Sequence, residues 1–271
     1  MVSRESVRSV QQASNLPAII QLLVMAMAPS KIFLLEHGAV FQEGAVVYRE
    51  LLVVLPASNS SKFVEMEPLA ELISQQNRGY YCSFYAECRV VEGLKRGELF
   101  FTLNFQKEKL VFDSYSMEYT EADAVQISLL KAQQLALFYR AIRKSYEFYQ
   151  SALLLGQRNI SPICCFFLHQ AIELCLRAII QHLGGYEKRT HQLRALKKQV
   201  IRVAPEMISC LSEESAIAKQ RIDVLEAAYL NARYSYEFSL PIKLLGELIE
   251  EVEQTLLKAR ELMQAKLAPA Y

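Results

Sequence analysis

The hydrophobic pattern of this chain changes its period near residue 120, and this change limits the possible folds most strongly. Before it, short apolar runs rich in β-branched and aromatic residues predict strands. After it, apolar residues recur every three or four positions with no strand pattern. The predicted fold class is therefore α+β, with a small mixed α/β domain at 1–120 and an all-α antiparallel helical bundle at 121–271.

Each half has a predicted order of elements. In the first half, Pro68 and Gly79 bracket a helical pattern at 67–77. The predicted strands lie at 31–35, 50–55 and 80–91, and a hairpin joins 99–105 to 110–112. In the second half, short connections separate five predicted helices, at 123–150, 162–183, 190–203, 214–231 and 241–267.

Charge and composition narrow the classes of function. Apolar residues make up 52% of the 271 positions, which excludes a disordered or low-complexity chain. The first 122 residues carry 11 Lys/Arg and 14 Asp/Glu, a charge of −3, whereas the remainder carries 19 and 15, a charge of +4. The second half is therefore the better candidate for an anionic ligand. Six cysteines without paired CxxC spacing predict reduced thiols in a cytoplasmic protein.

An apolar block at residues 16–28 permits two interpretations. It ends in Ala26-Met27-Ala28, which mimics a signal-peptidase site. Pro17, however, is typical of the first turn of a helix, and the block is too short to span a bilayer. A buried helix leading into the first strand explains the block, and we expect no membrane segment.

Three motifs in the second half carry a resemblance to a known family. They are the helix containing His169-Gln170-Ala171-Ile172-Glu173, the loop Thr190-His191-Gln192-Leu193, and the segment Ala232-Arg233-Tyr234. In this order and spacing they resemble the HEPN domain, an all-helical family. The resemblance implies a homodimer formed through the helical bundle, a nucleotide or RNA as ligand, and a regulatory role in stress or defence.

Residues 16–113 resemble a polymerase-β-type nucleotidyltransferase domain, which often precedes a HEPN domain. Such an enzyme needs a Gly-Ser turn to hold a triphosphate and an Asp-x-Asp pair to bind Mg²⁺. Here the turn position reads Glu36-His37, and the carboxylate positions fall on Tyr48 and Glu50. The resemblance therefore implies a degenerate domain without transfer activity, and we expect neither a metal site nor a cofactor.

HEPN ribonucleases carry an Arg-x(4–6)-His pair in which the histidine is the general acid or base. No histidine follows Arg233 in this chain. Arg177 and His182 have the required spacing, but along one helix their side chains diverge by about 140°, so we interpret the match as chance. A ribonuclease would instead need His191 or His169 to approach Arg233 in space.

The candidate ligand-binding residues are Lys188, Arg189, His191 and Arg233. Lys188 and Arg189 begin a basic run that extends to Arg202 and forms either a solvated helix face or a phosphate-binding surface. We expect no catalytic residue, and the leading hypothesis is a non-catalytic nucleotide- or RNA-binding protein. The alternatives are a metal-independent ribonuclease and a scaffold that binds protein partners.

One helix face carries tyrosines. Tyr139, Tyr146 and Tyr149 fall on one stripe of the helix predicted at 123–150. We interpret the stripe as a packing surface or as part of a dimer interface.

Overall fold

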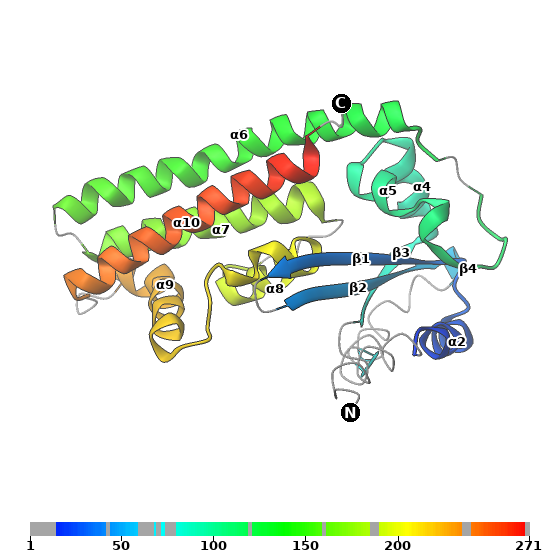
Figure 1. Ribbon diagram of the computed structural model, residues 1–271, viewed down its shortest axis with the longest axis horizontal. Helices are drawn as coiled ribbons and strands as arrows, with labels where there is room; N and C mark the ends of the chain where they lie inside the picture. Colours follow the sequence, from blue (N-terminus) through cyan, green and yellow to red (C-terminus); the bar gives the residue numbers. More distant parts are fainter. Residues whose placement is uncertain are drawn as a thin grey trace. The chain divides into compact units, whose positions relative to one another are not determined.

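The computed structural model describes residues 15–41, 44–58, 68, 72–73, 80–118, 121–158, 161–184, 190–234 and 240–268. The chain forms two compact units, residues 1–127 and 128–271 (Figure 1). A mixed α/β region comes first and a helical region follows, which confirms the predicted fold class. The predicted domain boundary at residue 120 lies just before the first bundle helix, and it stays a prediction.

A four-stranded sheet forms the centre of the first unit (Figure 1). Its strands are β1 (Lys31–Phe41), β2 (Gly44–Leu55), β3 (Tyr80–Ala86) and β4 (Leu110–Asp113), in the order β3-β2-β1-β4. Strand β1 runs antiparallel to both β2 and β4, and β2 runs parallel to β3. The three strands β2, β3 and β4 therefore point the same way.

Helices cover both faces of this sheet because its buried strands are apolar on both sides. Helix α2 (Leu16–Met27) packs through Leu23 against Ile32 and Val53. Helices α4 (Glu87–Lys95) and α5 (Leu99–Asn104) cover the other face, where Phe101 packs with Phe33. The buried-helix interpretation of residues 16–28 agrees with this packing, since Ile19, Leu23 and Met27 of α2 are buried.

Two strand predictions in this unit were wrong. Residues 87–91 begin helix α4, and residues 99–104 form helix α5, so the predicted hairpin does not exist. Strand β4 instead pairs with β1 at the edge of the sheet, after a 3₁₀ turn at Lys107–Lys109. A short apolar run has no periodicity that separates a strand from a buried helix, which explains the error at 99–105. The helix predicted at 67–77 lies almost wholly outside the described residues.

The second unit is a helical bundle, and its five predicted helices are confirmed. They are α6 (Ala124–Gln157), α7 (Ser161–Leu183), α8 (Leu193–Val203), α9 (Ala216–Tyr234) and α10 (Ile242–Leu267), with a 3₁₀ segment at Pro205–Ser209. Helix α7 is central, because it contacts α8, α9 and α10. By length and composition Pro162–Leu183 could also cross a membrane, but 67% of that window is buried inside the fold, as in the core helix of a bundle.

The tyrosine stripe of α6 faces another helix of the same chain. The Tyr139 hydroxyl donates to Gln264 Oε1 of α10 at 2.6 Å, and the Arg260 Cζ lies 5.7 Å from the centre of the Tyr139 ring. Tyr149 is buried. The packing interpretation of the stripe is therefore confirmed, and the homodimer stays a prediction.

Candidate functional site

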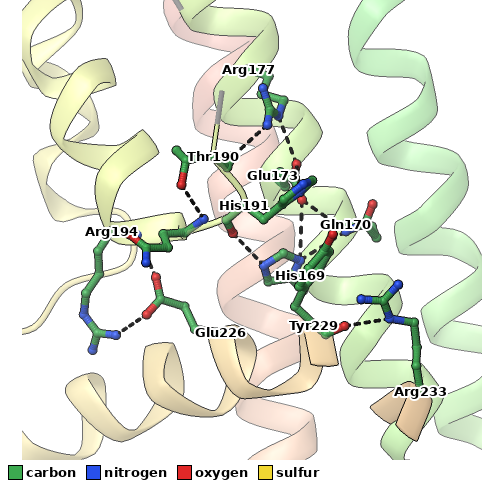
Figure 2. A network of polar contacts seen from close by, with 11 residues as sticks. His169, Gln170, Glu173, Arg177, Thr190, His191, Arg194, Glu226, Tyr229 and Arg233 are labelled. Atoms are coloured by element: carbon green, nitrogen blue, oxygen red, sulfur yellow. Dashed lines mark hydrogen bonds and ion pairs between the residues drawn. The ribbon is translucent and has the colours of Figure 1, made fainter. Parts of the chain in front are cut away.

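Polar side chains on one face of α7 meet the loop before α8 and the last turns of α9 (Figure 2). His169, Glu173 and Arg177 repeat at four-residue spacing, so they share a face of the helix. Because α7 is the central helix, this polar face is largely covered by its neighbours. Every buried polar atom there therefore needs a hydrogen-bond partner within the protein.

The carboxylate of Glu173 is the centre of the network, with a side chain that is 5% exposed. Its Oε1 accepts hydrogen bonds from His191 Nδ1 at 2.9 Å and from Arg177 Nε at 3.0 Å. Its Oε2 accepts one from Gln170 Nε2 at 3.1 Å. Both oxygens of this buried carboxylate are thus paired, which offsets the cost of removing the charge from water.

His169 is a fully buried structural residue. Its Nε2 lies 3.1 Å from the His191 carbonyl oxygen, which can only accept, so Nε2 carries the proton. Its Nδ1 then accepts from the Gln170 amide at 3.2 Å. Burial lowers the pKa of the ring and favours this neutral form. His169 is therefore a packed, hydrogen-bonded core residue.

His191 is held in place from several sides, yet its side chain remains 56% exposed. The ring stacks on Tyr229, with centroids 4.6 Å apart and planes at 17°. Its Nδ1 donates to Glu173, and none of the described residues hydrogen bonds to its Nε2. Arg177 Nη2 fixes the preceding residue by donating to the Thr190 carbonyl at 2.6 Å.

The helix predicted at 190–203 starts three residues later than expected, so Thr190 lies outside it. Helix α8 begins at Leu193, with Gln192 in the N-cap position. The Thr190 hydroxyl accepts from the Gln192 backbone N–H at 3.1 Å, so it stabilises the turn before the helix.

Arg233 lies in the last turn of α9 against aromatic rings. Its Cζ is 4.5 Å from the centre of the Tyr229 ring, 5.2 Å from that of Phe166 and 5.1 Å from that of Tyr234. Its Nε donates to the Tyr229 carbonyl at 2.7 Å. Within the described part of the chain no carboxylate pairs with Arg233, so its terminal nitrogens can bind an external anion.

The structure therefore brings two predicted residues, His191 and Arg233, to the same tyrosine ring. The His169 ring also lies 5.1 Å from the centre of Tyr229. Arg177 and His182 have separate partners, because Arg177 binds Glu173 and the His182 Nδ1 lies 2.8 Å from Gln134 Oε1. Their motif-like spacing thus creates no joint site.

The basic run is less available to a ligand than its sequence suggests. Lys188 and Arg189 lie outside the described residues. Arg194 donates to three carboxylates, at 2.9 Å to Glu213, 2.7 Å to Asp223 and 2.5 Å to Glu226.

Lys197 is also used within the fold. Its Nζ donates to the Leu211 carbonyl at 2.7 Å, and burial lowers its pKa. With Arg194 also paired internally, any phosphate-binding surface must use other cations.

The degenerate nucleotidyltransferase positions lie on the paired strands β1 and β2. Glu36 forms an exposed ion pair with Arg49 at 2.8 Å. His37 is opposite Tyr48 in the strand register, and Tyr48 stacks on Tyr81 with ring centroids 5.9 Å apart. Burial raises the pKa of Tyr48, which keeps the phenol neutral.

Glu50, the acidic residue at one of the two Asp-x-Asp positions, is buried and accepts a hydrogen bond from the Ser83 hydroxyl. Among the described residues, no group of three His, Cys, Asp or Glu side chains could hold a metal ion.

Sequence reasoning did not select two residues that organise the site. Glu173 is part of the motif on the second bundle helix, but its burial and its hydrogen bond with His191 depend on the tertiary fold. Tyr229 precedes Arg233 by four residues in a helix, so an aromatic residue and an arginine on one face were visible in the sequence.

No curated protein matches this chain in sequence. The HEPN domain family model matches residues 138–268, a stretch that contains every residue of the site around Glu173. The match does not extend to the first unit, where the likeness to a nucleotidyltransferase stays a prediction. The helical region of this chain is thus similar to the HEPN domain, as its three motifs predicted.

Proposed function

We propose that the helical unit is a non-catalytic module that binds a nucleotide or RNA at His191, Tyr229 and Arg233. The observation that carries this proposal is the position of Arg233. Its guanidinium lies against three aromatic rings and is unpaired with any described carboxylate. The similarity of residues 138–268 to the HEPN domain is consistent with a nucleotide- or RNA-related function.

The exposed groups at this site suit a single-stranded nucleic acid. An arginine fork binds phosphate oxygens in a planar, two-point geometry. Tyr234 is 74% exposed beside Arg233, so its ring is available for an unpaired base to stack on. A base stacked on an aromatic ring together with a phosphate on arginine is a common way to bind single strands.

Substitution of Arg233 tests this proposal. A fluorescently labelled single-stranded RNA and labelled ATP are titrated with the full chain, and anisotropy reports the dissociation constant. Arg233→Gln should weaken binding about fivefold or more, because a charge-assisted phosphate contact is lost. Arg143→Gln is the matched control, since Arg143 is an exposed helix arginine paired with Glu147 on α6. Equal effects of the two substitutions, or no binding by the unmodified chain, would refute the proposal.

A metal-independent ribonuclease is the second candidate, because Glu173 accepts a hydrogen bond from His191 Nδ1. In many enzymes a carboxylate orients a catalytic histidine through the same kind of hydrogen bond. The arrangement would leave Nε2 free to act as a general base, with Arg233 stabilising charge on the phosphate. Labelled RNA incubated with the chain in EDTA should then be cleaved, and His191→Ala should abolish cleavage. Intact RNA after prolonged incubation would leave the binding module as the better account.

We further infer that the first unit is a degenerate nucleotidyltransferase-like domain in a cytoplasmic homodimer with a regulatory role in stress or defence. Two observations support the loss of transfer activity: Glu50 is buried against Ser83, and Tyr48 stands at the other carboxylate position. Incubation with Mg²⁺ and radiolabelled ATP should give no labelled product. Light scattering of the purified chain should give twice the mass of 30.9 kDa.

A further inference from the structure

Strands β1 and β2 continue together beyond the rest of the sheet of the first unit (Figure 1). Among the described residues, β2 pairs with β3 only at 49–55, and β1 pairs with β4 only at 31–33. The hairpin itself stays paired as far as Phe41 and Gly44. Its outer part is therefore a two-stranded ribbon that extends past the start of β3.

The outer edge of β1 in this ribbon has no strand beside it in the described part of the chain. Strand β1 has two neighbours at 31–33, but from Leu34 to Phe41 its neighbour is β2 alone. The outward backbone N–H and C=O groups of such an edge can pair with an added strand. A two-stranded hairpin is only marginally stable in water, so a third strand would also stabilise the ribbon.

The composition of this edge favours pairing with another strand. Proteins that keep an edge unpaired commonly place lysine, proline or inward-pointing charges on it. Residues 34–41 contain no lysine, arginine or proline, and Glu36 is their one carboxylate. Arg49 of β2 lies 2.8 Å from that carboxylate, so the charge is compensated within the hairpin.

We propose that the β1 edge pairs with the same edge of a second copy of this chain, antiparallel about a two-fold axis, to form one continuous sheet. The edge is complementary to itself, because a two-fold axis sets two identical strands antiparallel and brings the donors of each to the acceptors of the other. This inference rests on the homodimer that is part of the proposed function, and it names the interface. It is independent of the ligand site in the helical unit.

The two-fold axis also limits the register of the two strands. Such an axis keeps each residue on its own face of the sheet, so residues that face each other differ by an even number. The pairing centred on Gly38 uses residues 35–41, sets Glu36 opposite Val40, and avoids placing His37 against its own copy. Like charges directly opposite each other would destabilise the pairing, and this register contains none.

Amide hydrogen exchange of the full chain tests the interface without any substitution. Peptides that cover residues 35–41 should exchange more slowly at high than at low protein concentration, because their outward amides become hydrogen-bonded in the dimer. Light scattering of the same samples gives the mass. Exchange at 35–41 that does not depend on concentration, in samples that pass from monomer to dimer, would overturn the inference.

Cysteine cross-linking locates the axis. Gly38→Cys, in a chain whose exposed Cys88 is replaced by serine, puts two thiols directly opposite each other, so that oxidised glutathione should join them in a disulfide. Val47→Cys is the matched control, because Val47 is opposite Gly38 within the hairpin. The two copies of Val47 would lie three strand spacings apart, about 14 Å, which is beyond the reach of a disulfide.

Gly38→Cys should give at least about tenfold more cross-linked dimer than Val47→Cys, since only the first pair meets the distance that a disulfide needs. A chain of twice the mass without this cross-link would overturn the inference and would favour a dimer through the helical bundle. A chain that stays at 30.9 kDa would overturn both this interface and the proposed homodimer, and would leave the proposed ligand binding untouched.

Discussion

Three histidines of the helical unit have different chemistry because their surroundings differ. His169 and His182 are buried, and burial lowers the pKa of both rings. The His182 Nδ1 donates to Gln134, and its Nε2 is buried without a hydrogen-bond partner among the described residues. The His191 ring, in contrast, is half-exposed and keeps one nitrogen for a ligand.

Acid should destabilise the bundle through its buried histidines. Below about pH 6.5 the unfolded chain binds a proton at His182, whereas the folded chain, with its lowered pKa, does not. The free energy of unfolding should therefore fall as the pH drops, by at most about 1.4 kcal/mol per pH unit for each such ring. Urea unfolding followed by circular dichroism between about pH 7 and 5 measures this slope.

The variant His182→Gln isolates the contribution of one ring. It removes the titrating group and keeps a polar side chain near Gln134, so its stability should depend less steeply on pH. Identical slopes for the variant and the unmodified chain would show that His182 does not contribute to the acid sensitivity.

Among the helices of the bundle, α8 and α9 are joined by one arginine. The Arg194 guanidinium donates to Glu226 and Asp223 of α9, and its backbone N–H donates to Glu226 Oε1 at 3.0 Å. His191 lies three residues before Arg194, and Tyr229 lies three residues after Glu226. The contact between Arg194 and Glu226 therefore also positions the His191 and Tyr229 rings relative to each other.

Arg194→Gln should destabilise the bundle by about 1–2 kcal/mol, because it removes the cation shared by three carboxylates, one of which, Glu226, is partly buried. Urea unfolding gives the change in the free energy of unfolding. Arg143→Gln, at an exposed pair within α6, should cost only a few tenths of a kcal/mol. A similar small loss for Arg194→Gln would mean that the link between α8 and α9 is not important for stability.

In the first unit, Gly93 permits the close contact of α4 with α5. A Cβ at this position would lie 2.9 Å from Phe101 Cε2 and still closer to other atoms of that buried ring. Gly93→Ala should therefore destabilise the chain by about 1–3 kcal/mol through overpacking, as measured by urea unfolding.

A second glycine provides the control for that substitution. A Cβ at Gly246 of α10 would meet no atom within 4 Å. Gly246→Ala should stabilise its helix by about 0.5–1 kcal/mol, since alanine loses less backbone entropy. Stabilisation by both substitutions would contradict the tight packing of α4 on α5.

At the scale of the whole molecule, the core of the sheet unit and the candidate site use different parts of the chain. The buried core residues of the sheet unit lie between residues 19 and 117. The residues of the site around Glu173 lie on α7, in the loop before α8, and on α9. The two units therefore have separate cores, and each should fold by itself. The proposed ligand site depends on the helical unit alone.

The fragment 121–271 should consequently bind single-stranded RNA with the affinity of the full chain. Anisotropy compares the two proteins, and circular dichroism verifies that the fragment is helical. Loss of affinity in a folded fragment would mean that the first unit contributes to binding.

The sequence by itself determined the five bundle helices and the two kinds of structure, and it named His191 and Arg233 as candidate ligand-binding residues. Helical periodicity and motif spacing are local properties, so they can be read along the chain. They failed at residues 87–91, where helix α4 begins, and at 99–105, where a short apolar run fits a strand and a buried helix equally well.

The tertiary structure alone decided which charges remain for a ligand. Arg194 and Arg233 are both arginines of the helical unit, but three acidic residues surround the first and three aromatic rings surround the second. The carboxylates that bind Arg194 and the Phe166 ring beside Arg233 come from segments distant in sequence, so no local pattern contains them. For the same reason, only the fold shows that Glu173 fixes Nδ1 of His191, while none of the described residues hydrogen bonds to its Nε2.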